Sequence, residues 1–181
     1  MPTHAAFLKG MNLGNRRLTN DELRGHFETI GLKEVATFRA SGNVIFTSPK
    51  RRSEKALTEL IEGELATLLG YPVATFIRSD AELREIAAAE PFDAATSKRL
   101  RGKPQVMLLG TAPTAARRKR ALSLASDEDA LAFGPRELHW LPAGGISESA
   151  LDMKALGDAL GPMTVRTKGT VEQIAARHFG A

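Results

Sequence analysis

The sequence predicts an α+β protein made of two βαββαβ modules in tandem, each an antiparallel sheet backed by helices. Two observations lead to this prediction. Short β-branched and aromatic runs alternate with apolar stripes at helical spacing in the order β-α-β-β-α-β over residues 4–78. The same order returns, less clearly marked, in the second half. Hydrophobic residues make up 43% of the 181 residues and charged residues 25%, which is typical of a folded globular chain.

The first module covers residues 1–80, and its elements have clear start and stop signals. Thr19 or Asn20 caps the first helix and Gly31 ends it, while Ser53 opens the second helix and Gly70 ends that one. In order, the expected elements are a strand at 4–9, a helix at 20–30, strands at 35–38 and 43–47, a helix at 53–69 and a strand at 73–78.

The second module covers residues 81–181 and includes an extra C-terminal helix. Gly134 and Pro135 mark its hairpin, and Pro113 marks the first turn of a helix. The expected elements are a helix at 80–90, a strand at 105–109, a helix at 113–124, strands at 130–133 and 137–141, a helix at 151–160, a strand at 163–166 and a helix at 171–178. No residue-level repeat relates the modules, so the duplication is one of element order.

The composition excludes several classes of chemistry. There is no cysteine, which excludes disulfides, thiolate nucleophiles and cysteine-held metals. The four histidines show neither i, i+4 pairing nor an HExxH context, so we expect no metal and no cofactor. No nucleophile elbow, kinase signature, P-loop or GxGxxG fingerprint is present. Ser41 is a conceivable nucleophile without a base near it in sequence, so no catalytic residue is assigned and enzymatic activity stays open.

Apolar runs in the chain are short. The longest, such as residues 106–109, fall far below the roughly 20 residues that span a bilayer. No export signal stands at the N-terminus. We therefore expect a cytoplasmic location and no membrane partner, and the oligomeric state is not predicted.

Positive charge is concentrated in the second half, which supplies the whole formal net charge of +4. Between Ala94 and Ser126 no acidic residue interrupts the basic ones, which are Lys98, Arg99, Arg101, Lys103, Arg117, Arg118, Lys119 and Arg120. Such a patch can bind the phosphates of a nucleic acid. The alternative, which we favour, is the solvated face of a helix whose Leu122 and Ala121 or Ala125 point inward. An aromatic content of 6% also argues against base stacking.

Three motifs connect this chain with a known family. They are Leu8-Lys9-Gly10-Met11-Asn12-Leu13-Gly14, Ala40-Ser41-Gly42-Asn43-Val44-Ile45-Phe46 and Pro91-Phe92 before a strand. In order and spacing they resemble the LLRGINVGG, QSGNVVF and NPF motifs of the bacterial Domain of Unknown Function 1697 family. The resemblance implies a pair of ferredoxin-like, or α/β-plait, domains and no settled activity.

The C-terminal third departs from the pattern of that family. Ser149-Ala150-Leu151 lacks the lysine of the family's Ser-Lys-Leu. Residues 164–171 keep the threonine, the arginine and Thr-Val but lose the asparagine and tryptophan of Thr-x-Arg-Asn-Trp. If those groups bind a ligand elsewhere in the family, this chain lacks part of the site.

The topology suggests one candidate site. In a βαββαβ sheet the spatial strand order is 4-1-3-2, so the end of the first strand lies beside the start of the third. The first helix also begins at that edge, where its free N–H groups and positive dipole end favour an anion. We therefore predict a site for a phosphate or carboxylate group, in which the contributing residues are Lys9, Gly10, Asn12, Gly14, Arg39, Ser41 and Asn43.

A purely structural interpretation of the same residues stays open, and it is the commoner outcome. The glycines then only form turns, and Asn12 and Asn43 only satisfy loop backbone. From the residues alone, the chain is an uncharacterised protein whose expected partner is a small anionic ligand. A nucleic acid, or no ligand at all in an interaction module, are the alternatives.

Overall fold

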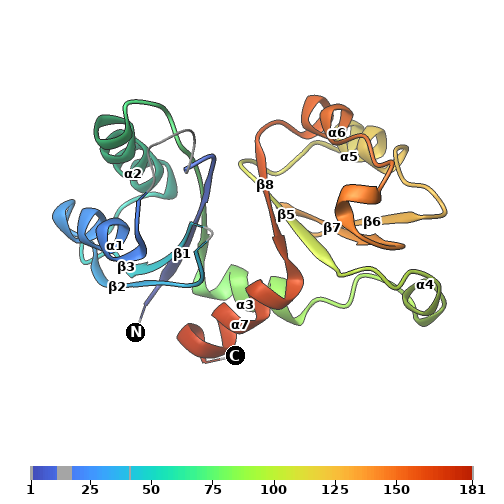
Figure 1. The fold of residues 1–181 in the computed structure, drawn as a ribbon, viewed down its shortest axis with the longest axis horizontal. Coiled ribbons are helices and arrows are strands. Elements are labelled where there is room, and N and C mark those ends of the chain that lie inside the picture. The colour runs from blue at the N-terminus through green and yellow to red at the C-terminus, as the bar shows by residue number, and fades with distance from the viewer. Residues whose placement is uncertain (1, 12–17, 41, 181) are drawn as a thin grey trace. The chain divides into compact units, whose positions relative to one another are not determined.

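The computed structural model describes residues 2–11, 18–40 and 42–180. The chain divides into two compact units, the first formed by Met1–Arg84 with Ile174–Ala181 and the second by Glu85–Gln173. Each unit holds a four-stranded antiparallel sheet backed by helices, so the predicted fold class is confirmed (Figure 1). The sheet orders, β2-β3-β1-β4 and β6-β7-β5-β8, are both the predicted 4-1-3-2 order.

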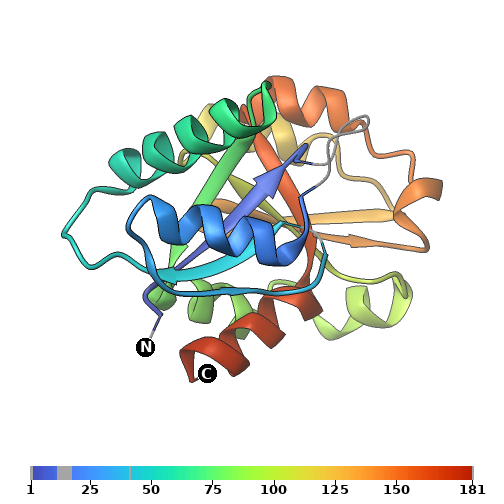
Figure 2. The ribbon, with the colours of Figure 1, turned by 60° about the vertical axis from the view of Figure 1, so that its left-hand side comes forward.

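Unit 1 follows the predicted element order closely. Its elements are β1 His4–Lys9, α1 Asn20–Thr29, β2 Lys33–Thr37, β3 Asn43–Thr47, α2 Glu54–Leu69 and β4 Ala74–Ser79, followed by α3 Asp80–Ala88. Thr19 and Glu22 form a capping box at the start of α1, and Gly70 ends α2 with a left-handed φ of 77°. Helices α1 and α2 cover one face of the sheet (Figures 1 and 2).

The core of unit 1 is built from alternating strand residues. Ala6, Val44 and Ile77 face the two helices, where they meet Phe27 of α1 and Ile61 of α2. The residues between them in sequence, Ala5, Phe7, Ile45 and Phe76, point to the other face and are buried as well. Both faces of this sheet are therefore apolar and buried, unlike the open sheet on which nucleic-acid-binding plaits stack bases.

Unit 2 repeats the arrangement with two additions to the predicted elements. Its elements are α4 Ala94–Arg99, β5 Gln105–Leu109, α5 Ala115–Leu122, β6 Asp129–Phe133, β7 Glu137–Pro142, the 3₁₀ helix η1 Ile146–Glu148, α6 Met153–Leu160 and β8 Met163–Thr167. Helix α4 and η1 were not expected. Met107 and Trp140 of the sheet pack with Leu156 of α6 and Ala121 of α5.

Some element boundaries differ from those expected. Thr114 caps α5, so Pro113 stands before the helix rather than in its first turn. Helix α7, Lys168–Phe179, begins directly after β8, three residues earlier than expected. Its last part groups with unit 1, where Arg84 donates to the carbonyl of Phe179 at 2.9 Å. The first boundary thus lies after Arg84, four residues beyond the expected end of the first module at residue 80, and the C-terminal residues belong to unit 1.

The two units share register as well as element order. In each, the last part of the first strand donates a backbone N–H to the residue before the third strand: Leu8 to Gly42 at 2.8 Å and Leu109 to Arg136 at 3.0 Å. Arg78 and Arg166 occupy equivalent places, each beside the second residue of its central strand. Each also donates to the carbonyl of its preceding residue.

Two glycines of unit 2 differ in the space around them, and alanine substitutions at the two positions test the packing of this unit. A Cβ on Gly102 would lie 2.3 Å from the carbonyl oxygen of Pro142 and 2.5 Å from that of Gly144, whereas a Cβ on Gly157, inside α6, meets nothing within 4 Å. We expect Gly102→Ala to lower the free energy of unfolding by about 1–3 kcal/mol because the backbone must shift. Gly157→Ala should raise it by roughly 0.5–1 kcal/mol. Urea titrations check both values, and equal effects of the two substitutions would contradict the packing.

His139 gives the stability of unit 2 a pH dependence. Burial, and then the charge of Lys168, lower the pKa of His139 to about 4, although the Glu137 carboxylate lies 4.0 Å from its Nε2. Because the unfolded chain protonates this histidine near its ordinary pKa of about 6.5, the unfolded state binds the proton first as the pH falls. Stability contributed by neutral His139 is therefore present above pH 6.5 and lost between about pH 6.5 and 4.

We expect His139→Gln to flatten that part of the pH profile. Wild-type protein should lose unfolding free energy steeply between pH 6.5 and pH 4, and the variant less so, whatever its stability at pH 7. Denaturant titrations at half-unit pH intervals measure both curves. Parallel curves would mean that folding does not lower the pKa of His139.

Candidate functional site

The edge of unit 1 at which β1 ends brings together residues that are far apart in sequence. β1 and β3 are antiparallel neighbours, with Phe7 opposite Asn43. Lys9 and Gly10 leave β1 at this point, beside Gly42. Gly10 and Gly42 have left-handed φ angles of 72° and 70°, which glycine adopts without strain. The hydroxyl of Tyr71 donates to the carbonyl of Met11, so the chain is held as it leaves the strand.

Three of the predicted site residues lie outside the described part of the chain. They are Asn12, Gly14 and Ser41. The remaining four, Lys9, Gly10, Arg39 and Asn43, lie at or beside the edge, and of these Asn43 is buried while the other three are exposed.

Asn43 has a structural task at this edge. Its side chain is 1% exposed and its Nδ2 donates to the carbonyl of Phe38 at 2.9 Å. The backbone N–H of Phe38 in turn donates to the carbonyl of Asn43 at 3.0 Å. These two bonds close the β2–β3 hairpin, which matches the structural interpretation of Asn43. Asn43 therefore stabilises the turn from the buried side, and its side chain does not face solvent.

Arg39 lies in this hairpin and shares an aromatic ring with a distant arginine. Its backbone has a φ of 59°, uncommon for a residue with a side chain. Its guanidinium carbon lies 5.5 Å from the centre of the Phe38 ring, and that of Arg177, near the end of α7, lies 5.7 Å from the same ring. Cation–π contacts of this kind help to hold guanidinium groups in place.

Sequence reasoning missed Arg177. It lies 138 positions after Arg39 in the numbering and belongs to a helix that returns to unit 1 only in the folded chain. Phe38, the aromatic residue that both arginines contact, was part of a predicted strand. Its contact with Arg177 was not predicted. We refer to Lys9, Arg39 and Arg177 together as the edge cations.

The start of α1 contributes less positive potential than expected. Asn20 donates its Nδ2 to the carbonyl of Arg39 at 3.3 Å, which places this helix end next to the hairpin as predicted. However, the Glu22 carboxylate accepts from the backbone N–H of Thr19 at 2.8 Å, and this contact lowers the pKa of Glu22. An acidic side chain of the protein thus already occupies the positive end of the helix.

The basic patch of unit 2 is only partly available for a partner. Arg118 donates to the carbonyls of Gly134 and Pro135 at 3.0 and 2.8 Å and lies 4.9 Å from the centre of the Phe133 ring, so it fastens α5 to the β6–β7 hairpin. Arg99 donates to the carbonyl of Asp127. The remaining six are exposed: Lys98, Arg101, Lys103, Arg117, Lys119 and Arg120. Ala121 points inward as expected, but the expectation for Leu122 was wrong, since it is 42% exposed.

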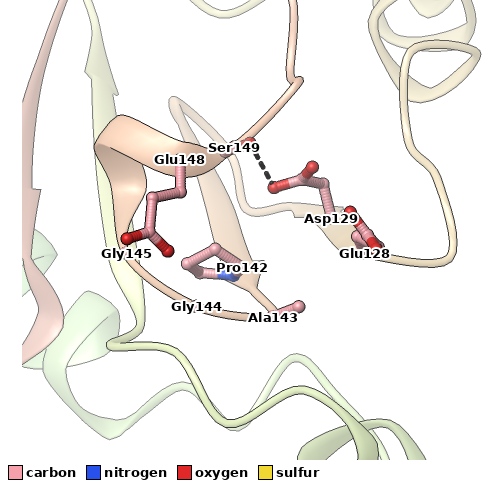
Figure 3. A pocket seen from close by; sticks show the side chains of 8 residues that line it. All are labelled: Glu128, Asp129, Pro142, Ala143, Gly144, Gly145, Glu148 and Ser149. Carbon is pink, nitrogen blue, oxygen red and sulfur yellow. Dashed lines mark hydrogen bonds between the residues drawn. The ribbon is translucent and has the colours of Figure 1, made fainter.

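An acidic pocket of about 270 Å³ lies beside β6 and β7 in unit 2 (Figure 3). Asp129 accepts from Trp140 Nε1 and from the Ser149 hydroxyl, both at 2.7 Å, so it joins the sheet to the segment before α6. In Figure 3 the carboxylates of Glu128 and Glu148 lie on opposite sides of the pocket. Within the described ranges, no three histidine, aspartate or glutamate side chains gather as a metal-binding group. Nor does any helix there have the length and apolar character to cross a bilayer.

A likeness to a solved structure extends over nearly the whole chain. The conserved bacterial protein SP0830 from Streptococcus pneumoniae superposes with a TM-score of 0.71 at 19% sequence identity, with 97% of each chain covered. At this identity the likeness concerns the fold, and it supports the two-unit α+β architecture. No curated protein matches the sequence.

The family model that matches is described as a protein of unknown function, DUF1697, and it covers residues 1–139. The match includes the three motifs on which the resemblance was based. It ends before residues 149–151 and 164–171, where the sequence departs from the family's pattern. The matched part is more than half of the chain, and the protein therefore belongs to the DUF1697 family.

Proposed function

We propose that unit 1 binds a small anion, a phosphate or a carboxylate group, at the edge where β1 ends and the β2–β3 hairpin turns. The observation that carries the proposal is the shared ring of Phe38, which gathers the guanidinium groups of Arg39 and Arg177 beside the hairpin. Lys9 is exposed at the end of the neighbouring strand. Cations of this kind form charge-assisted hydrogen bonds to anions, the stronger class of hydrogen bond.

The backbone of the same edge suits a compact anion. Gly10 and Gly42 adopt left-handed backbone conformations, which favour glycine. The edge therefore has no side chain at these two positions. A Cβ on Gly42 would lie 3.1 Å from the Cβ of Leu8, so the close approach of the two strands itself requires glycine. Asn12, Gly14 and Ser41 remain proposed ligand residues because they are neighbours of these positions in sequence.

Nucleic-acid binding by the residue 98–120 patch has weaker support. Two of its eight cations, Arg99 and Arg118, donate to backbone carbonyls of the protein. Asp127 and Glu128 are exposed next to the contact that Arg99 makes, and they would repel a phosphate backbone. A ligand-free interaction module stays the remaining alternative, and it predicts no response to anions at all.

Titration with inorganic phosphate tests the proposal. Added at constant ionic strength to the full chain, phosphate should shift the backbone amide resonances of Gly10 and Gly42 and saturate. Lys9→Ala, Arg177→Ala and Arg39→Asn should each weaken phosphate binding about tenfold, because a hydrogen bond to a charged group contributes roughly 1.5–3 kcal/mol. Asparagine is chosen at position 39 because it tolerates a left-handed backbone.

Lys50→Ala is the matched control, since Lys50 is an exposed lysine in the loop before α2. It should leave phosphate binding unchanged. Acetate in place of phosphate separates a carboxylate site from a phosphate site. Unchanged affinity in all three edge variants, or amide shifts confined to unit 2, would refute the proposal.

A further inference from the structure

A second pocket of unit 2 lies where the chain enters β5, and its wall combines apolar side chains with a nearly buried amine. Its volume is about 250 Å³, just below the roughly 300–1,000 Å³ of pockets for drug-sized ligands, so it suits a smaller molecule. The lining residues that matter most are Phe92, Leu100 and Leu141 on the apolar side and Lys168, His139 and Gln105 on the polar side.

Lys168 is held at this pocket by one backbone carbonyl and by two ion pairs that are longer than direct hydrogen bonds. Its side chain is 11% exposed, and its Nζ donates to the carbonyl of Ala89. The carboxylates of Glu90 and Glu172 lie 3.5 and 3.8 Å from Nζ, and their side chains are 89% and 50% exposed. A direct charge-assisted N–H···O bond measures about 2.7–2.9 Å. The two carboxylates thus neutralise Lys168 from a distance, and a closer carboxylate would be better bound.

The other polar groups fit a singly charged anion. Because the pKa of His139 is lowered to about 4, its ring is neutral at pH 7 and can donate or accept a hydrogen bond. Arg101 adds an exposed cation to the lining and Glu90 an acid. Among the described residues, Lys168 and Arg101 are the cations of this lining and Glu90 is its anion, while Glu172 places a second carboxylate beside Lys168.

We propose that this pocket binds a small monocarboxylate with an apolar body, whose carboxylate accepts from Lys168 Nζ while the body lies against Phe92, Leu100 and Leu141. Among anions, one with a single negative charge meets the least repulsion from Glu90 and Glu172. A phosphate dianion would place two negative charges beside Glu90 and Glu172. A neutral apolar molecule would offer no carboxylate to Lys168, whose ion pairs would stay those with Glu90 and Glu172. The site is independent of the edge cations of unit 1.

Benzoate is the probe, and benzamide its neutral counterpart of the same shape. Titrated into the full chain at pH 7, benzoate should shift the amide resonances of Phe92, Leu100 and Lys168 and saturate. Benzamide should bind at least about tenfold more weakly, because it lacks the charge that Lys168 recognises. Equal binding of the two compounds would overturn the proposal, as would the absence of benzoate binding.

Three variants test whether Lys168 binds the carboxylate of benzoate. Lys168→Gln should weaken benzoate binding about tenfold or more. Glu90→Gln should strengthen it about two- to fivefold, because it removes a carboxylate that competes for Lys168. Lys154→Gln is the matched control: Lys154 is an exposed lysine on α6 whose Nζ lies 3.0 Å from Asp158, and its replacement should change nothing.

Glu90→Gln keeps the test decisive if Lys168→Gln fails to fold, since a largely exposed glutamate can be replaced without loss of packing. Unchanged or weaker benzoate binding in Glu90→Gln would refute the role of Lys168. Benzoate-induced shifts at Gly10 and Gly42 instead of Phe92 would assign the carboxylate to the edge of unit 1. Because phosphate and benzoate are read at different amides, either proposal can fail while the other stands.

Discussion

Antiparallel pairing of the first and third strands is the constraint on which the rest of each unit depends. In unit 1 it is marked by the bond from the Leu8 N–H to the Gly42 carbonyl, and in unit 2 by the equivalent bond from Leu109 to Arg136. This pairing sets which residues of the strands face the helices and which face the other side. In unit 1 it also brings the end of β1 against the β2–β3 hairpin, where Gly42 follows Leu8 by 34 residues, and this makes an edge site geometrically feasible.

The two units have the same sheet topology but different polar residues at equivalent positions. Asn43 and Glu137 occupy equivalent positions after the hairpin and are both buried, but one is a neutral amide bonded to the Phe38 carbonyl and the other is an acid near His139. In unit 1 the exposed cations gather at the hairpin edge. In unit 2 Lys168 lies at the opposite end of the central strand, where its backbone N–H donates to Pro104 at 2.9 Å. The two proposed sites therefore differ in position as well as in ligand.

The number of basic residues in a stretch of sequence did not indicate which basic side chains can bind an anion. The strongest basic run, residues 98–120, includes Arg118, whose guanidinium donates to three backbone carbonyls and lies against an aromatic ring. By contrast, Arg177 and Lys168 stand in no basic run, yet each lies where an anion could be recognised. A guanidinium or ammonium group interacts with whatever the fold brings near, and sequence spacing records only a small part of that environment.

The sequence by itself determined the order of the elements apart from α4 and η1, and the caps of α1 and α2, because apolar periodicity and local capping are properties of neighbouring residues. The 4-1-3-2 sheet order followed from that element order. The sequence also located the turn at residues 39–42, between the strands expected at 35–38 and 43–47, and the edge beside it. Only the tertiary structure decided that Asn43 faces inward, that Glu22 occupies the start of α1, and that Arg177 shares the ring of Phe38. The pocket at Lys168 likewise came from the fold alone, since it joins the chain before β5 to the start of α7. Such contacts join residues far apart in sequence, and no local pattern encodes them.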